Sequence, residues 1–136
     1  MRINLTLSIV GASLALSMPT ITIMGHHSFA AEFDANKPVT LRGTVTKVER
    51  VNPHGWIHMD VKDQNGKVEN WAIETAAPGQ LARRGIRKDF PPIGMEIVVT
   101  GYRAKDGTTT ANGATLKTPD GKDLFVGSSG PDAPVR

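Results

Sequence analysis

The sequence contains no cysteine, and this absence removes several kinds of chemistry from consideration. Disulfide bonds, thiolate nucleophiles and cysteine-ligated zinc or iron–sulfur sites cannot form in this chain. The usual signatures of enzymes are missing too. The carboxylates show no spacing typical of an acid–base pair, the serines lie in no nucleophile elbow, and no glycine-rich loop joins a strand to a helix as a phosphate site requires. We therefore expect a protein that is not an enzyme.

A strong excess of charge of one sign is also missing. Lysine and arginine total 16 and the acidic residues 13, which leaves a net charge of +3 in 136 residues, and the two signs are interspersed. This balance argues against a nucleic-acid partner. With 39% hydrophobic residues, 14 glycines and 9 prolines, the composition is typical of one globular domain with many turns.

The chain has no hydrophobic run of the length that spans a membrane. Arg2 precedes an apolar run of about 14 residues that Pro19 ends, whereas a spanning helix needs about 20. A single positive charge followed by a short apolar run is typical of a secretory signal peptide, which we place at residues 1–25. The prediction is a periplasmic or secreted protein with no stable membrane span after cleavage; the alternative is an uncleaved anchor.

The position of signal cleavage decides which histidines remain in the mature protein. Cleavage after Ser17, Gly25 or Ala30 is compatible with the small residues there. Cleavage after Gly25 would make His26 the new N-terminal residue, so that its amine and imidazole could bind one metal ion together. Cleavage just before Gly25 would give a Gly-His-His start, which also suits Cu(II). Cleavage after Ala30 would remove both His26 and His27.

The mature chain shows the alternation of apolar and polar residues that is typical of strands. A shift of this alternation near Lys47 indicates a bulge, and Asn65-Gly66 predicts a tight hairpin turn. The predicted elements are strands over 38–51, 55–61, 68–75, 94–103, 109–116 and 124–126, with one short helix over 78–87.

This order of elements predicts an all-β fold. The expected form is a small OB-like antiparallel barrel of five to six strands with one short helix, and an antiparallel sandwich is the competing fold. The predicted organisation is a signal peptide over 1–25, an extended segment over 26–37, the barrel over 38–126 and a disordered tail over 127–136.

Several strings of residues resemble one family of small exported bacterial proteins of unknown function. They are HHSFAAEFD at 26–34, NPHGWIH at 52–58, WAIE at 71–74, RRG at 83–85 and GYRAKDG at 101–107. Members of that family begin the mature region with His-His-Ser-Phe and carry an Asn-Pro-His segment after a long first strand. The resemblance implies export and a compact β fold, and it implies no activity.

The four histidines form two pairs, His26 with His27 and His54 with His58. Imidazole is a common ligand for copper and zinc. On one extended strand His54 and His58 would lie about 13 Å apart, too far to share an ion. The better predicted metal site therefore combines His26 and His27 with His54, with Glu32 or Asp34 as further oxygen ligands. The alternative is that the N-terminal histidines are merely exposed and that His54 serves a turn.

Two other groups of residues are candidates for binding. Trp56 and Trp71 stand on neighbouring predicted strands, either as an aromatic platform or as a stabilising pair, and Trp56 with His58 is the candidate ligand surface. The basic residues of the predicted helix could meet an anionic partner or could simply be solvated; they are Arg83, Arg84 and Arg87, followed by Lys88.

The leading hypothesis is a small periplasmic binding protein that holds copper, or alternatively zinc, at the N-terminal histidines. The second hypothesis is a non-enzymatic module that binds an envelope protein through the barrel face and the basic helix, without metal. A third, copper-dependent oxidation, would need an open coordination position. The sequence does not determine the oligomeric state.

Overall fold

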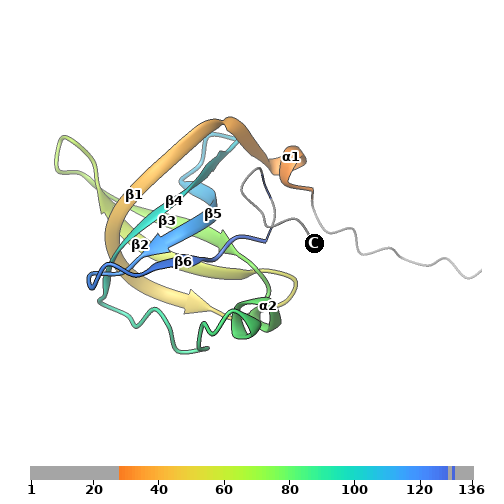
Figure 1. Cartoon of the computed structure of the whole chain (residues 1–136). Coiled ribbons are helices and arrows are strands. Elements are labelled where there is room, and N and C mark those ends of the chain that lie inside the picture. Colours follow the sequence, from red (N-terminus) through yellow and green to blue (C-terminus); the bar gives the residue numbers. More distant parts are fainter. Residues whose placement is uncertain (1–27, 129, 131–136) are drawn as a thin grey trace, which may run out of the picture.

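Six strands and two short helices make up the computed structural model, which describes residues 28–128 and 130 (Figure 1). The predicted signal peptide, His26 and His27 lie outside these residues, as do 129 and 131–136 of the predicted tail. The elements in chain order are α1 (Phe29–Glu32), β1 (Phe33–Glu49), β2 (Gly55–Lys62), β3 (Val68–Thr75), α2 (Pro78–Arg83), β4 (Glu96–Ala104), β5 (Thr110–Lys117) and β6 (Asp123–Phe125).

The strands form a six-stranded sheet in the order β3-β2-β1-β4-β5-β6, and β3 also pairs with β5. This additional pairing closes a ring of hydrogen-bonded strands through β1, β2, β3, β5 and β4. All the pairings are antiparallel except β3 with β5, which is parallel. The prediction of a mostly β fold is confirmed. The ring distinguishes this arrangement from the competing sandwich fold, in which two separate sheets stack face to face.

These segments form strands because their side chains alternate between buried and more exposed positions. In β2 and β3, Ile57, Met59 and Ile73 point inward and are almost fully buried, while the residues between them are more exposed. The register of β1 against β2 shifts between Val45 and Lys47, which confirms the predicted bulge. Such a bulge lets the 17-residue β1 bend so that it pairs with β2 at one end and β4 at the other.

The helices differ from the prediction of a single helix over 78–87. α2 begins at Pro78 as expected, and Gln80 Oε1 accepts a hydrogen bond from the backbone N–H of Ala77. It ends at Arg83 because Gly85, with a φ of +77°, takes the left-handed conformation that stops helices. A second helix, α1, and the first residues of β1 occupy part of the segment that was expected to be merely extended.

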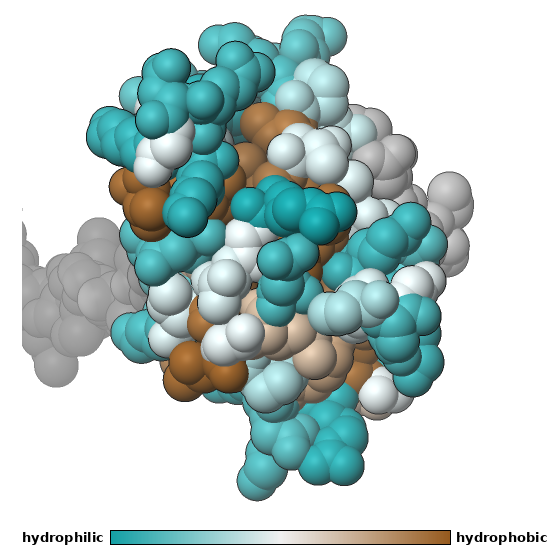
Figure 2. Space-filling model, turned by 90° about the vertical axis from the view of Figure 1, so that its left-hand side faces the viewer, coloured by the Kyte–Doolittle hydropathy of each residue, from teal (hydrophilic) through white to brown (hydrophobic). Residues whose placement is uncertain are grey.

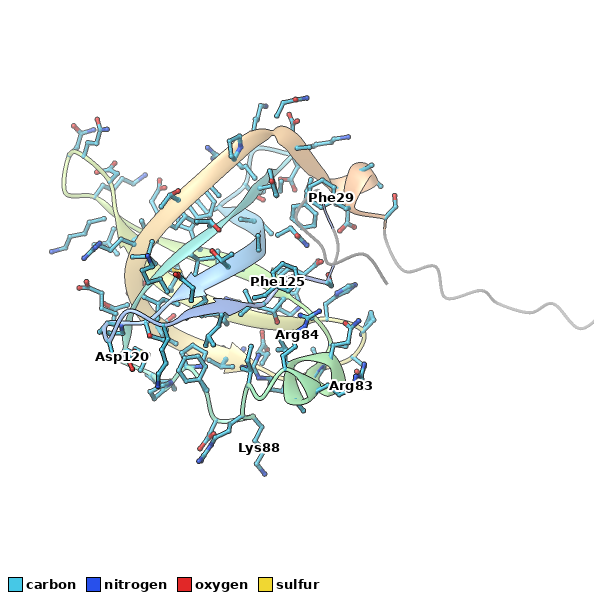
Figure 3. All side chains as sticks on the ribbon, viewed as in Figure 1. Phe29, Arg83, Arg84, Lys88, Asp120 and Phe125 are labelled. Atoms are coloured by element: carbon cyan, nitrogen blue, oxygen red, sulfur yellow. The ribbon has the colours of Figure 1, made fainter. Side chains whose placement is uncertain are left out.

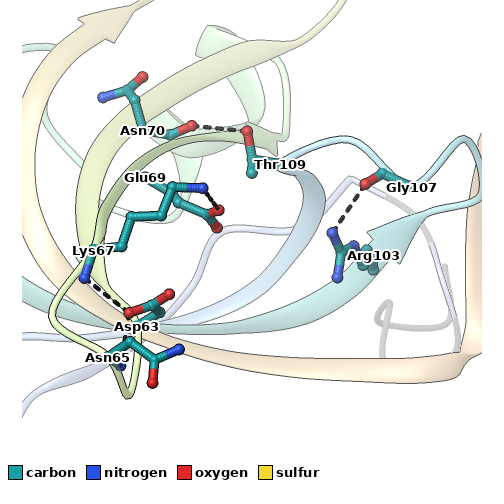
Figure 4. Close-up of polar contacts among 8 residues, drawn as sticks. All are labelled: Asp63, Asn65, Lys67, Glu69, Asn70, Arg103, Gly107 and Thr109. Atoms are coloured by element: carbon teal, nitrogen blue, oxygen red, sulfur yellow. Dashed lines mark hydrogen bonds and ion pairs between the residues drawn. The ribbon is translucent and has the colours of Figure 1, made fainter.

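The predicted hairpin turn lies between β2 and β3 (Figure 4). Asp63 Oδ1 accepts hydrogen bonds from the backbone N–H groups of Asn65 and Lys67, both at 2.8 Å, and Gly66 has a φ of +81°. Farther along β3, the Thr109 hydroxyl donates to the Asn70 carbonyl oxygen at 2.9 Å. The turn therefore sets the register of β2 against β3, and Thr109 ties the start of β5 to β3.

The core fills the interior of the ring. Trp71 is buried there, with the Arg103 guanidinium 5.4 Å from its ring centre. Trp56 lies on the opposite face, because it is paired with Glu74 whereas Trp71 is paired with Met59. The two tryptophans therefore form no cross-strand pair. The buried cluster consists of Leu41, Val45, Ile57, Met59, Trp71, Ile73, Ala76, Leu81, Ile86, Ile97, Val99, Ala111, Leu116 and Val126.

The two faces of the molecule differ. Both helices and the described residues after β6 (126–128, called the C-terminal segment below) lie on one side of the ring (Figure 1). The opposite side shows mainly hydrophilic and neutral residues, with small and separate apolar areas (Figure 2). Neither α1 nor α2 is long and apolar enough to cross a membrane.

Candidate functional site

A row of four residues crosses the outer face of the ring on the side of the helices. Trp56 in β2 is paired with Glu74 in β3, Glu74 with Asn112 in β5, and Asn112 with Tyr102 in β4. Directly paired residues project to the same face of a sheet. The residues beside them in the chain, Ile57, Ile73 and Ala111, point into the core. The row is therefore external to the core, although Glu74 and Asn112 are both buried.

His54 joins this row from the connection between β1 and β2. It follows the cis peptide bond of Asn52-Pro53, and its Nδ1 lies 3.6 Å from Glu74 Oε1. Gly55 comes next, and a Cβ atom there would lie 2.7 Å from Thr75 Oγ1 and 3.2 Å from the Glu49 carbonyl oxygen. Only glycine therefore allows the chain to approach β3 closely enough to bring His54 beside Glu74.

Asn112 contacts the same oxygen of the Glu74 carboxylate as His54 does. Its Nδ2 donates a hydrogen bond of 3.1 Å to Glu74 Oε1. Asn112 is 1% exposed and Glu74 is 7% exposed. The Oδ1 atom of Asn112 is buried and has no hydrogen-bond partner among residues 28–128 and 130. The result is a buried carboxylate and a buried carbonyl oxygen side by side, which is an arrangement that favours a cation or a hydrogen-bond donor.

The start of the described chain packs against the same row. The Phe29 ring meets Tyr102 edge-on, with 5.5 Å between ring centres. A Cβ atom added at Gly130 would lie 3.1 Å from Phe29 Cε2 and 3.7 Å from Asn112 Oδ1. Phe29 and Asn112 Oδ1 therefore flank the same small volume beside Gly130. The two predicted N-terminal ligands, His26 and His27, directly precede Ser28 in the chain and lie outside the described residues.

The C-terminal segment runs beside this site and is attached at several points. The Val126 N–H donates to the Ala114 carbonyl oxygen at 2.9 Å, and its carbonyl oxygen accepts from the Ala76 N–H at 2.7 Å. Arg84 Nη1 donates to the Gly127 carbonyl oxygen at 2.9 Å, and its guanidinium lies 4.8 Å from the Phe125 ring centre. Figure 3 shows Phe29, Phe125 and Arg84 on the same side of the ring. Gly127 was expected to belong to a disordered tail, and the structure places it as a buried residue.

The other histidine of the second pair has a separate environment. His58 Nε2 lies 2.8 Å from Glu49 Oε2, so this ring nitrogen carries the hydrogen and donates it to the carboxylate. The structure thus gives His54 and His58 different carboxylate neighbours, in line with the expectation that they do not share an ion. In the part of the chain that the structure describes, no three histidine, aspartate or glutamate side chains are grouped closely enough to hold a metal ion.

The Glu49 carboxylate gives a prediction about pH. Hydrogen bonds from Lys47 and then His58 lower its pKa below the usual value of 4.5. A carboxyl group whose pKa is lowered by folding adds stability above its unfolded pKa, and this stability is lost as the pH falls through the folded pKa. We expect Glu49→Gln to lower the thermal unfolding midpoint slightly at pH 7 and not at pH 3, as measured by circular dichroism. An equal decrease at both pH values would contradict this account.

Trp56, the predicted ligand surface, lines a cavity of about 400 Å³ between α1 and the ends of β2, β4 and β5. The remaining lining residues include Glu32 and Phe33, together with the turn at Lys105 and Asp106. Lys105 holds α1 in place, because its backbone N–H donates to the Glu32 carbonyl oxygen at 2.8 Å and its Nζ donates to the Ala30 carbonyl oxygen.

The predicted basic cluster is divided by its contacts. Arg84 is engaged with the C-terminal segment, as described above, and Arg87 pairs with Asp89 at 2.6 Å. Arg83 and Lys88 are exposed on and after α2 and make no ion pair with any described residue (Figure 3). Arg84 therefore helps to hold the C-terminal segment in place. Substitutions that test whether this surface binds a partner should be made at Arg83 or Lys88 instead.

Sequence reasoning did not find Glu74 and Asn112 as site residues. Glu74 was visible only as one of several carboxylates, and Asn112 sits in a Thr-Ala-Asn-Gly-Ala string without a motif. The signal that could have found Glu74 is its place on the outward side of a strand, paired with Trp56 across the predicted hairpin. Nothing in the local sequence shows that this outer face is buried.

Comparison with known proteins places the chain in a family without assigning an activity. No curated protein and no solved structure matches it. One protein family matches the chain from residue 14 to residue 114, a range that includes most of the described β structure. Through these residues the chain belongs to the family of unknown function DUF6152.

Proposed function

We propose that this protein is a small periplasmic binding protein that holds one transition-metal ion, copper in the first place and zinc as the alternative. In this proposal the ring of strands is an OB-like barrel, which presents ligands on its outer face. The ion is held by His54 together with His26 and His27 of the mature N-terminus. The protein would buffer, deliver or sense the ion rather than catalyse a reaction.

The observation that carries the proposal is the pair of half-buried His54 and buried Glu74 on the side of the ring where α1 packs. Two or three residues of extended chain span about 7 to 11 Å. His27 and His26 are two and three residues from Phe29, whose ring flanks the Asn112 oxygen beside Glu74. Covalent geometry therefore allows the N-terminal imidazoles to reach the same volume as His54.

Several features favour a bound cation beside Glu74. Glu74 is a buried carboxylate with a histidine nitrogen 3.6 Å from its Oε1 atom, and buried carboxylates commonly pair with positive charge or coordinate metals. Imidazole nitrogens with a carboxylate oxygen form a ligand set that suits copper and zinc. Cleavage after Gly25 would add the amine of His26 as a further nitrogen ligand.

The test is the native intact mass of the protein exported to the periplasm, recorded with and without added Cu(II). We expect a mature start at Gly25 or His26 and one retained copper ion per chain. His54→Ala and the double change of His26 and His27 to alanine should each weaken retention at least about tenfold. His58→Ala is the matched control, because His58 contacts a different carboxylate, and it should retain copper as the parent does.

A different result would favour the non-enzymatic interaction module. If the chain began at Ala31, or if His54→Ala bound Cu(II) as well as the parent, the metal proposal would be wrong. Docking of an envelope partner through α2 would then be the better account, and Arg83→Glu should abolish capture of that partner. Arg83 suits this test because it makes no ion pair with any described residue.

A further inference from the structure

The donor atoms that the described residues bring to the candidate site are nitrogen and oxygen. The chain has no cysteine, and the two methionines within the described residues lie elsewhere. Met59 is fully buried in the core, and Met95 lines a cavity beside Ile86 and Phe90. Soft sulfur ligands are those that select Cu(I), whereas imidazole and carboxylate suit divalent ions.

The spacing of His54 and Glu74 fits a shared ion. Their nearest atoms, Nδ1 and Oε1, lie 3.6 Å apart, which is too long for a direct hydrogen bond. Two ligands at about 2.1 Å from a tetrahedral ion lie about 3.4 Å from each other. The observed separation is therefore close to the edge of such a coordination sphere, and only a small adjustment would place both atoms on one ion.

Asn112 supplies a second and independent sign of a ligand. Its side chain is 1% exposed, its Nδ2 orients Glu74, and its Oδ1 has no partner among the described residues. A buried carbonyl oxygen without a hydrogen-bond donor destabilises the folded state. An ion, or the hydrogen of an ion-bound water or imidazole, would satisfy this atom.

We propose that Glu74 is a direct ligand, that Asn112 is its positioning residue, and that the site therefore selects divalent Cu(II) or Zn(II) over Cu(I). This inference rests on the proposed function and makes it more specific. Glu74 provides the negative charge that a divalent ion needs, and Asn112 fixes the carboxylate by its hydrogen bond. Hydrogen bonds of this kind to metal ligands commonly change affinity by 10- to 100-fold.

The experiment uses the mature full-length protein loaded with Cu(II), studied by electron paramagnetic resonance, and parallel competition titrations with Cu(II), Zn(II) and Cu(I). Glu74→Gln keeps the shape and the hydrogen bond from Asn112 while removing the charge. We expect it to shift the copper hyperfine splitting and to weaken Cu(II) binding at least about tenfold, with little effect on Cu(I). Glu74→Asp, which keeps the charge, should retain part of the affinity and guards against a folding defect.

Glu49→Gln is the matched control, because Glu49 also lies beside a histidine of the same region. It should leave the spectrum and the affinities unchanged. A parent protein that binds Cu(II) while Glu74→Gln gives the same spectrum and affinity would overturn the role of Glu74 and leave the proposed function standing. Tighter binding of Cu(I) than of Cu(II) would overturn the selectivity. A parent protein that binds none of the three ions would overturn both.

Discussion

Replacing Gly101 with alanine is expected to lower the free energy of unfolding by about 3 kcal/mol, and the unfolding midpoint by about 12 °C or more. Gly101 in β4 faces Gly113 in β5, at a point where the register of the two strands shifts. A Cβ atom added at Gly101 would lie 2.1 Å from the Asn112 carbonyl oxygen and 3.0 Å from its carbonyl carbon. These are backbone atoms, so the two strands would have to move apart.

The same change should disturb the candidate site. β5 carries Asn112, and its pairing with β3 closes the ring of strands. A shift of β5 would therefore move Asn112 away from Glu74 and weaken the closure of the ring. Thermal unfolding followed by circular dichroism measures the loss of stability.

Gly79→Ala is the control for Gly101→Ala. Gly79 lies in α2, and a Cβ atom there would meet only Arg83 Nη1 at 3.6 Å, which is an ordinary contact. Because alanine favours a helix over glycine, this variant should be neutral or more stable by up to about 1 kcal/mol. If Gly101→Ala unfolded at the same temperature as the parent, the close approach of β4 and β5 would not be the constraint that the structure indicates.

Most strands could be predicted because their pattern is local. The alternation of Val68 to Thr75 places Trp71 and Ile73 on one face, and both are buried as that pattern predicts. The shift near Lys47 likewise marks a bulge that the structure contains. The start of β1 was harder to predict. Asp34, Lys37 and Pro38 interrupt the alternation of apolar and polar residues there, although this part of β1 also pairs with β4.

The candidate site was only partly predictable, because its members meet through pairings that are distant in the sequence. His54 was visible as a histidine at a strand junction. Glu74 comes beside it through the pairing of β2 with β3, and Asn112 joins them only when β3 pairs with β5. Asn112 Oδ1 lies close to Gly130, in the tail that was expected to be disordered, and Phe29 packs against the same glycine. A polar residue on the outer face of a strand normally indicates solvent, so the burial of Glu74 could not be predicted from its own strand.

The burial of Glu74 leads to the prediction with the second large effect, a gain of stability on adding metal that requires this carboxylate. In the metal-free protein, Glu74→Gln keeps the hydrogen bond from Asn112 and should change the free energy of unfolding by no more than about 1 kcal/mol. A ligand that binds only the folded state adds about 2.7 kcal/mol at 100 times its dissociation constant. Cu(II) or Zn(II) at that level should therefore make the parent more stable than the variant.

Unfolding midpoints of the protein, with chelator and then with excess Zn(II), measure this difference directly. Zn(II) should raise the midpoint of the parent by about 10 °C or more and that of Glu74→Gln by about half as much or less. Glu49→Gln should respond to Zn(II) as the parent does, because its carboxylate lies beside His58 rather than His54. Equal increases in the parent and Glu74→Gln would show that the ion binds elsewhere. A smaller increase confined to Glu74→Gln would mean that the ion binds to this buried carboxylate.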